Sequence, residues 1–393
     1  MPGGSIMEHL NRYRRVWAFF RWALGPWLKH KFHYTPELCD AEGTYLVLAN
    51  HNTDWDPLLL GLAFPNYMSF VASEHIFRKP LTAKLLGFLV APIARLKGTT
   101  AGDTAMTMLR RLKKGVSVAM FAEGNRSFDG RTGTILPATG KLARSSGAGL
   151  ITYRFDGGYF TSPRWSGGSI RRGKLTGRVV NVYTPEQLKA MSPAEVNEAI
   201  NRDLYVDAYA VQRREMVPFE GKALAEGLET VLCRCPKCGG LDTLHSSGDT
   251  LRCGCGFSAR YNAYGFLEGE DAPFDNITDW DTAQTAALCA LADGVSDNDT
   301  PIFSDDGMVL TEILPDHRTA ELGRGSMTLY ADRLECCGMT FPLSALGGFM
   351  LHGPQDVDLS MDGRSYAISS PERRCTRKYM TIIDHLRLTA RTL

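Results

Sequence analysis

Tyr45-Leu-Val-Leu-Ala49 is a short β-prone run that leads through the polar stretch Asn50-His-Asn-Thr-Asp-Trp-Asp56 into Pro57-Leu-Leu-Leu-Gly-Leu-Ala63. This order predicts a buried strand, a polar turn and a helix that begins beside Pro57. Further strands are predicted over residues 68–72 and 116–121, with a helix between them. Strands that alternate with helices predict an α/β domain with a mostly parallel sheet, whose ligands bind at the carboxyl ends of the strands.

The polar turn after the first strand holds a histidine and a carboxylate five positions apart, His51 and Asp56. A histidine that leaves a strand can turn back so that the carboxylate accepts a hydrogen bond from one ring nitrogen, and the other nitrogen is then available as a general base. The alternative is structural, because Asp56 is also well placed as the N-cap of a helix with Pro57 at its first position. The pair alone does not decide between these two interpretations.

A second loop follows the strand predicted over residues 116–121 and reads Glu123-Gly-Asn-Arg-Ser127. Its glycine permits close backbone approach, and an arginine fork beside a serine hydroxyl suits a phosphate monoester. Taken alone, this loop is better explained as a surface turn with a solvated arginine.

Together, the two loops resemble the glycerolipid acyltransferase superfamily, which includes bacterial 1-acylglycerol-3-phosphate acyltransferases. The resemblance covers residues 40–215. It rests on His51-x4-Asp56 followed 72 positions later by Glu123-Gly-Asn-Arg-Ser127. Between these loops, residues 87–95 resemble the intermediate acceptor-binding motif of the family, and residues 149–158 stand where the family has its fourth motif.

Three positions depart from the family pattern. Ala122 replaces the usual proline and Asn125 the usual threonine of the third motif, and Thr152 stands where the fourth motif has proline. The first two changes are conservative for a loop. The third, with the basic stretch over residues 165–178, bears on the identity of the acceptor.

The resemblance implies an enzyme that moves a fatty acyl group from an acyl-CoA or acyl carrier protein thioester to the hydroxyl of a lysophospholipid-like acceptor, 1-acylglycerol 3-phosphate. His51 is then the catalytic base and Asp56 holds it in place. The implied substrate-binding residues are Glu123, Gly124, Arg126, Ser127 and Arg95. The alternative is a non-catalytic lipid-binding or scaffolding protein on the same fold, which the joint presence of these residues disfavours.

Length and charge indicate more than one domain. The chain has 393 residues, of which 44% are hydrophobic and 22% charged, so two or three globular domains are expected and disordered, collagen-like or coiled-coil structure is excluded. Up to Lys222 there are 30 Lys and Arg against 18 Asp and Glu, and beyond it 14 against 25. The basic first half indicates an anionic partner, which is a phosphorylated ligand, an acidic membrane surface or nucleic acid.

Residues 1–35 are predicted to be an amphipathic membrane-interface segment, and residues 36–228 the acyltransferase domain. Trp17, Trp22 and Trp27 lie among arginines and lysines, a pattern typical of a helix in the headgroup region and equally of a terminal helix packed on its own domain. The segment has neither a long enough apolar run to span a bilayer nor a signal-peptide layout. We therefore expect a cytoplasmic protein, peripheral on the inner face of the cell membrane.

Two cysteine pairs, Cys235-Pro-Lys-Cys238 and Cys253-Gly-Cys255, are separated by fourteen residues, and each is followed by glycine. Four thiolates at this spacing predict a structural zinc ion in a ribbon over residues 229–262. Because the second pair is unusually tight, Cys233 or His245 could replace one ligand. Four thiolates leave no open metal position, which argues against a zinc hydrolase, and the ribbon is neither basic nor aromatic enough to indicate nucleic-acid binding.

The remaining residues, 263–393, have a different pattern. About six short strand-like runs separated by turn signals, and then a helical stretch over residues 378–388, predict a small antiparallel β domain with a C-terminal helix. Its architecture resembles a pleckstrin-homology-like barrel. Its acidic balance favours a packing or protein-binding role over anionic lipid headgroups.

Overall fold

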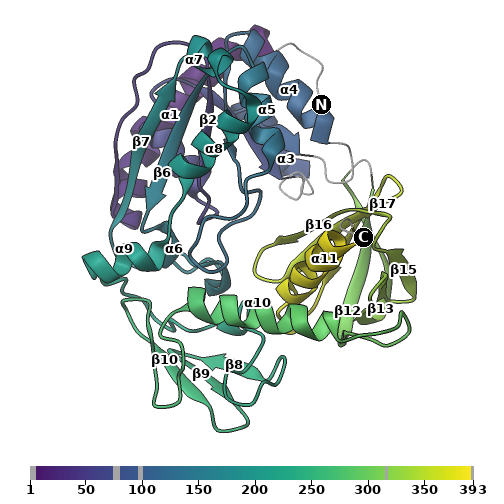
Figure 1. Cartoon of the computed structure of the whole chain (residues 1–393). Coiled ribbons are helices and arrows are strands. Elements are labelled where there is room, and N and C mark those ends of the chain that lie inside the picture. Colours follow the sequence, from purple (N-terminus) through teal and green to yellow (C-terminus); the bar gives the residue numbers. More distant parts are fainter. Residues whose placement is uncertain (1–5, 74–79, 96–100, 315–316, 391–393) are drawn as a thin grey trace. The chain divides into compact units, whose positions relative to one another are not determined.

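The computed structural model describes residues 6–73, 80–95, 101–314 and 317–390. The chain forms two compact units, Met1–Pro163 with Gly168–Glu220 and Arg164–Gly167 with Gly221–Leu393 (Figure 1). The first unit contains the α/β fold together with the N-terminal helix. The second contains the cysteine-rich segment and the β-rich C-terminal region. Residues 1–5 of the predicted N-terminal segment lie outside the described residues.

A seven-stranded sheet in the order β1-β7-β6-β2-β5-β3-β4 forms the centre of the first unit. The five strands from β6 to β4 are parallel to one another, whereas β7 is antiparallel to β6 and β1 is parallel to β7. The predicted mostly parallel sheet is therefore confirmed. The strands are β1 (Tyr34–Pro36), β2 (Tyr45–Ala49), β3 (Met68–Ser73), β4 (Ile93–Arg95), β5 (Ser117–Phe121), β6 (Gly149–Asp156) and β7 (Leu175–Tyr183).

Helices cover both faces of this sheet. Successive side chains of a central strand point to opposite faces, so its apolar side chains are buried only when both faces are covered. Val47 and Ala49 of β2 belong to a core with α1 and α2, whereas Leu46 and Leu48 belong to a second core with α4, α5, α7 and α8. Ser192 caps α8, and its hydroxyl accepts the N–H of Glu195 at 3.2 Å. The helices are α1 (Leu10–Phe32), α2 (Asp56–Ala63), α3 (Pro80–Leu89), α4 (Ala101–Lys113), α5 (Pro137–Ser145), α6 (Gly158–Thr161), α7 (Pro185–Ala190), α8 (Pro193–Leu204) and α9 (Ala208–Glu215).

The N-terminal helix α1 has one buried and one exposed apolar face. Tyr13 and Trp17 are buried against the domain, and the indole Nε1 of Trp17 donates to the carbonyl of Phe64 at 3.0 Å. The exposed large side chains are Phe19, Trp22, Leu24 and Trp27, and Trp22 is 77% exposed. In the described residues, none of the helices combines the length and the apolar character that crossing a bilayer requires.

The carboxyl ends of the parallel strands lie at one edge of the sheet, and this edge positions the predicted site. Ala49 at the end of β2 pairs with Phe121 at the end of β5. The loop with His51 and the loop with Glu123 therefore start side by side, although 72 positions separate the two residues in the chain. Arg95 ends β4 at the same edge, and β3 lies between β4 and β5.

The cysteine-rich segment of the second unit is built on a small antiparallel sheet in the order β11-β10-β9-β8. Cys253 ends β9, and Cys235 and Cys238 lie in the turn region that precedes β8. The strands are β8 (Leu244–Ser247), β9 (Thr250–Cys253), β10 (Ser258–Tyr261) and β11 (Leu267–Glu268).

A second seven-stranded sheet, antiparallel throughout, forms the C-terminal region in the order β15-β14-β13-β12-β18-β17-β16, and α11 follows it. The predicted antiparallel β fold with a C-terminal helix is confirmed. The strand β12 and the long helix α10 were not predicted from the sequence. The elements are α10 (Ile277–Asp293), β12 (Phe303–Ile313), β13 (Thr319–Leu329), β14 (Arg333–Cys336), β15 (Met339–Pro342), β16 (Leu346–His352), β17 (Asp356–Met361), β18 (Arg364–Ser369) and α11 (Arg377–Thr389).

A buried ammonium connects this sheet to the cysteine-rich segment within the second unit. Lys378 of α11 is 1% exposed, and its Nζ lies 2.8 Å from a carboxylate oxygen of Asp305 in β12. It also forms an ion pair with Asp242, which lies between the first cysteine pair and β8. Because a buried charge is tolerated only when it is paired and hydrogen-bonded, these contacts fix α11 against the cysteine-rich segment.

Candidate active site and metal centre

His51 and Asp56 form a direct pair in the loop between β2 and α2. The ring Nδ1 of His51 lies 2.9 Å from Oδ2 of Asp56, whose side chain is only 1% exposed. A carboxylate oxygen can only accept, so Nδ1 carries the hydrogen and Nε2 has a free lone pair. With its hydrogen on Nδ1, His51 has the tautomer that a general base requires. About a fifth of its side chain is exposed.

The carboxylate of Asp56 is itself held by the loop that it follows. The backbone N–H groups of Asn52 and Thr53 donate to Oδ2 at 2.6 and 2.9 Å, and the hydroxyl of Thr53 donates to Oδ1 at 2.6 Å. The N-cap interpretation of Asp56 is not observed, because α2 starts at Asp56 itself and has no side-chain cap. The donors come from residues before the helix, so the carboxylate shapes the loop around His51.

The imidazole of His51 also stacks on the ring of Phe121. The two ring centroids are 4.3 Å apart and the planes are inclined by 20°. Phe121 is the last residue of β5, so the neighbouring strand sets the ring plane while Asp56 sets its rotation.

Glu123 connects the second loop to the first. Its Oε1 accepts the backbone N–H of His51 at 2.7 Å, and its Oε2 accepts that of Gly133 at 2.6 Å. Burial raises the pKa of Glu123 to about 8, and the two N–H donors only partly offset this effect. Both carboxylate oxygens of this predicted substrate-binding residue are thus engaged by the backbone of the protein.

Arg126 and Ser127 have different environments, although they are adjacent. Arg126 is 6% exposed, and one terminal nitrogen lies 3.3 Å from Oδ2 of Asp54. Ser127 donates its hydroxyl hydrogen to the carbonyl of Arg131 at 2.7 Å and accepts the N–H of Gly130 at 3.0 Å. The serine hydroxyl therefore closes its own turn, whereas the sequence pattern predicts that it assists Arg126 with a phosphate.

The two remaining predicted residues lie on either side of β3. Gly124 adopts φ +74°, a left-handed conformation that favours glycine and lets the chain turn after β5. Arg95 ends β4, three strand spacings from β2, which corresponds to about 14 Å between backbones. Burial lowers the pKa of its guanidinium, and among the described residues no carboxylate pairs with it.

Part of this chain is similar to known proteins. Residues 30–156 match the family model described as Acyltransferase. This segment, which contains His51, Asp56 and Arg126, is therefore similar to the acyltransferase family. The chloroplastic 1-acyl-sn-glycerol-3-phosphate acyltransferases of Arabidopsis thaliana and Brassica napus are each 26% identical to this chain, over 180 and 182 residues. These matches cover 44% of this chain and 50% and 53% of the two relatives, so the chain spans about half the length of the curated relatives it matches.

A solved structure is also similar to this chain. The 1-acyl-sn-glycerophosphate acyltransferase from Thermotoga maritima aligns with a TM-score of 0.41 and 18% sequence identity. The alignment covers 52% of this chain and 79% of that protein.

Two residues of the acyltransferase domain contribute to the site without having been predicted. Asn50, which is 2% exposed, donates to the carbonyl of Phe155 at 3.0 Å and accepts its N–H at 2.8 Å. These bonds extend the β2–β6 pairing to the residue before His51. Asp54 is the second missed residue, and its position between His51 and Asp56 is the only sequence signal for it.

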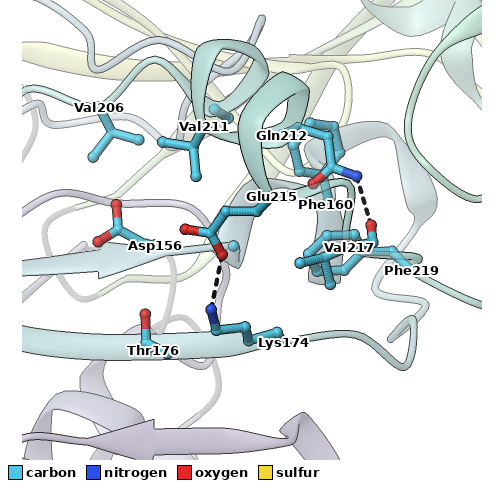
Figure 2. A pocket seen from close by; sticks show the side chains of 12 residues that line it. Asp156, Phe160, Lys174, Thr176, Val206, Val211, Gln212, Glu215, Val217 and Phe219 are labelled. Atoms are coloured by element: carbon cyan, nitrogen blue, oxygen red, sulfur yellow. Dashed lines mark hydrogen bonds and ion pairs between the residues drawn. The ribbon is translucent and has the colours of Figure 1, made fainter.

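A small pocket of about 70 Å³ lies beside the end of β6, between Lys174, Gln212 and Glu215 (Figure 2). Lys174 pairs with Glu215 at 2.8 Å, and Gln212 donates to the carbonyl of Val217 at 2.5 Å. Neither His51 nor Arg126 lines it. Because small-molecule sites occupy about 300–1,000 Å³, this pocket does not hold a lipid substrate.

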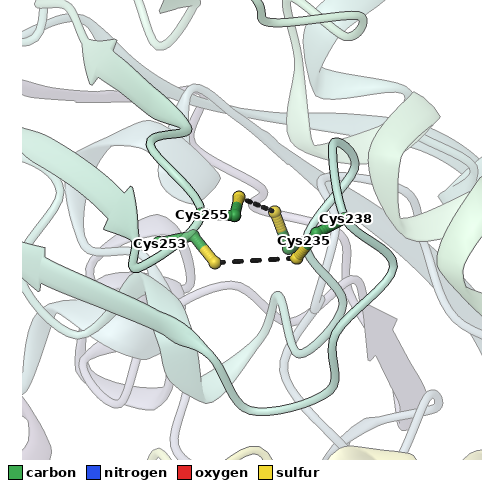
Figure 3. Close-up of side chains that lie close together, drawn as sticks. All are labelled: Cys235, Cys238, Cys253 and Cys255. Carbon is green, nitrogen blue, oxygen red and sulfur yellow. Dashed lines mark hydrogen bonds between the residues drawn. The ribbon is translucent and has the colours of Figure 1, made fainter.

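The four predicted metal ligands converge in the second unit. The sulfur atoms of Cys235, Cys238, Cys253 and Cys255 all lie within 4.8 Å of one another (Figure 3). Cys235 and Cys255 are 3.7 Å apart, and Cys238 and Cys253 are 3.8 Å apart. A tetrahedron with zinc–sulfur bonds of 2.3 Å has an edge of about 3.8 Å, so the arrangement fits a zinc ion.

The backbone around the cluster has the form that a metal knuckle needs. The N–H of Gly240 points at the sulfur of Cys238 at 3.4 Å. The two suggested substitutes are not part of the group within the described residues. Cys233 lies 3.6 Å from Oε1 of Gln284, and His245 is exposed on β8.

Proposed function

We propose that this protein is an acyltransferase that esterifies the hydroxyl of a lysophospholipid-like acceptor, 1-acylglycerol 3-phosphate, with the acyl group of an acyl-CoA or acyl carrier protein thioester. The observation that carries the proposal is the oriented His51–Asp56 pair beside a buried arginine at one edge of the sheet. A base and an anion-binding cation on adjacent loops are what transfer to a phosphorylated alcohol needs.

The reaction proceeds by direct transfer. Nε2 of His51 takes the proton of the acceptor hydroxyl as its oxygen attacks the thioester carbonyl carbon. The tetrahedral intermediate then expels the thiolate, which takes the proton back from the imidazolium. Asp56 keeps Nδ1 protonated and stabilises the imidazolium while it exists. No covalent enzyme intermediate is required, because the hydroxyl attacks the donor itself.

Arg126 is the residue that we assign to the acceptor phosphate. Its guanidinium presents several N–H donors in a plane, and a phosphate monoester offers three acceptor oxygens. Arg95 at the end of β4 is a second cation at the same edge, and it is the alternative candidate for the acceptor phosphate.

The test is an assay of the full chain with a panel of lysolipids and labelled acyl donors. Wild type should form an ester product, and His51→Ala should lose it while its thermal melt is retained. His30→Ala, which changes an exposed histidine of α1, is the matched control. A wild-type protein that binds these lipids without any His51-dependent product would instead be a non-catalytic lipid-binding protein.

The cysteine cluster is proposed to hold one structural zinc ion. Four thiolates fill a tetrahedral coordination sphere, so the metal has no position for substrate and supplies folding energy rather than chemistry. The small sheet β8–β11 consists of four strands of two to four residues, and the metal would fix the turn that carries Asp242.

The exposed face of α1 is proposed to bind an anionic membrane, on the inner face of the cell membrane. Three aromatic side chains, Phe19, Trp22 and Trp27, are 48–77% exposed, and large aromatics at this exposure are typical of membrane interfaces. Lys31 lies over the rings of Trp27 and Trp55 at 4.6 and 5.1 Å. Because Trp55 adjoins Asp56, a membrane bound at this face delivers lipid close to His51.

For residues 263–393, we propose a packing or protein-binding role for a pleckstrin-homology-like domain. The contacts of Lys378 with Asp242 and Asp305 connect it to the cysteine-rich segment. These contacts use buried charges of the domain internally, which supports a structural role.

A further inference from the structure

In the part of the chain that the structure describes, Arg126 is a buried cation with little counter-charge. Its side chain is 7% exposed, and a guanidinium has five N–H donors to satisfy. Among the described residues its charged partner is Asp54 alone, at 3.3 Å and on one nitrogen. Burying a charge is costly unless it is paired and hydrogen-bonded, so this arginine is arranged for an additional anion.

Asp54 is held far less firmly than Asp56, two positions later in the same loop. Its side chain is 72% exposed, whereas Asp56 is buried and accepts several hydrogen bonds. In the described residues, Arg126 is the one partner with which the Asp54 carboxylate forms an ion pair. Ion pairs with an exposed member are weak, because solvent screens them and the side chain moves freely.

We propose that Asp54 is a competing counter-ion, which occupies the anion side of Arg126 in the free enzyme and is displaced by a phosphate monoester. This inference rests on the proposed function, in which Arg126 binds the acceptor phosphate. A phosphate monoester at neutral pH carries close to two negative charges and three acceptor oxygens, so it competes well against one carboxylate. A phosphodiester has one charge and a neutral acceptor has none, so both compete less well.

The direct test is calorimetric titration of inorganic phosphate at constant ionic strength and pH 8, where phosphate is mainly a dianion. Asp54→Asn removes the competing charge, and Glu198→Gln is the control because it makes the same change in net charge at an exposed residue of α8. Asp54→Asn should bind phosphate about two- to fivefold more tightly than wild type, as expected for loss of an exposed ion pair. Glu198→Gln should match wild type, and Arg126→Gln should lose the binding.

A kinetic comparison tests the competition with the substrate itself. Asp54→Asn should lower the KM for the phosphorylated acceptor by a similar factor, and its preference for that acceptor over a neutral monoacylglycerol should widen, because the neutral acceptor has no phosphate that displaces Asp54. The second effect is not expected of a residue that only shapes the loop.

Two results would overturn the proposal in distinguishable ways. If Asp54→Asn behaves like Glu198→Gln while Arg126→Gln loses phosphate, Asp54 is not a competitor, and the phosphate site at Arg126 stands. If Arg126→Gln binds phosphate as wild type does, or if neither wild type nor Asp54→Asn binds it, the phosphate assignment of Arg126 fails and the role of Asp54 fails with it.

Discussion

Replacing Asp56 with asparagine separates the orientation of His51 from its electrostatic support. The N–H groups of Asn52 and Thr53 both point at Oδ2, so only the oxygen of the new carboxamide can take that place. This oxygen still accepts from Nδ1 of His51. The amide nitrogen then faces the hydroxyl of Thr53, which rotates to accept instead of donating. The correct tautomer is retained and the negative charge is lost.

The size of the effect follows from what the charge does for the imidazolium. A hydrogen bond to a charged group is stronger than a neutral one by about 1 kcal/mol, which sets the lower limit. Two unit charges about 4 Å apart interact by about 4 kcal/mol at an effective dielectric constant of 20, which sets the upper limit. At 1.36 kcal/mol for each factor of ten, Asp56→Asn should lower kcat by about 5- to 10³-fold.

The assay is steady-state turnover at saturating donor and acceptor, with His51→Ala measured in parallel. His51→Ala removes the base altogether and should lower kcat by about 10²- to 10⁴-fold. A loss in Asp56→Asn equal to or greater than that of His51→Ala would mean that the backbone donors do not hold the oxygen in place. Wild-type turnover in Asp56→Asn would show that the charge contributes nothing to the reaction.

Three further outcomes are expected. Arg126→Lys should raise the acceptor KM by about tenfold, because a point charge cannot replace the planar fork, and unchanged acceptor kinetics would move the phosphate site to Arg95. One zinc ion per chain should co-purify with the wild type. Cys238→Ser should lose the zinc and melt at a lower temperature, whereas Cys289→Ser should retain it. Metal analysis that finds no zinc in the wild type would contradict the zinc ribbon. Trp22→Asp should weaken sedimentation with anionic vesicles, and wild-type binding to these vesicles should fall as salt rises from about 0.05 to about 0.5 M. If vesicle binding changes with neither the substitution nor the salt, α1 only packs on its own domain.

The central strands and the two loops could be predicted because their signals are local. Residues 45–49 are apolar without interruption, and the polar residues that follow can only lie at a strand end. The long strand β12 lacks such a signal, since an irregularity between Asp305 and Met308 breaks the alternation of its side chains. Helix α10 was missed because its apolar residues are interspersed with Asp and Thr, although Asn276 caps it by accepting the N–H of Asp279 at 2.8 Å.

Partners of the site side chains depend on tertiary structure, and the sequence does not specify them. An arginine beside a serine predicts two donors for one phosphate, but the hydroxyl of Ser127 is used by Arg131 in its own turn. Likewise, nothing in the spacing of the first loop indicates that Asp54 approaches Arg126 of the second loop. Such pairs arise because β2 and β5 are neighbours in the sheet, and the local sequence of either loop does not specify this strand order.

The two loops act as one structural element, because the second loop holds the backbone of His51 on both sides. Glu123 accepts the N–H of His51, and the N–H of Ser127 donates to the carbonyl of His51 at 2.9 Å. A carboxylate with both oxygens occupied by backbone donors has little capacity left to bind a substrate, and an ionised Glu123 would repel the phosphate that we propose for Arg126. The raised pKa of about 8 reduces that repulsion near neutral pH. In the proposed reaction, Glu123 therefore acts through the position of His51 and not through a contact with the acceptor.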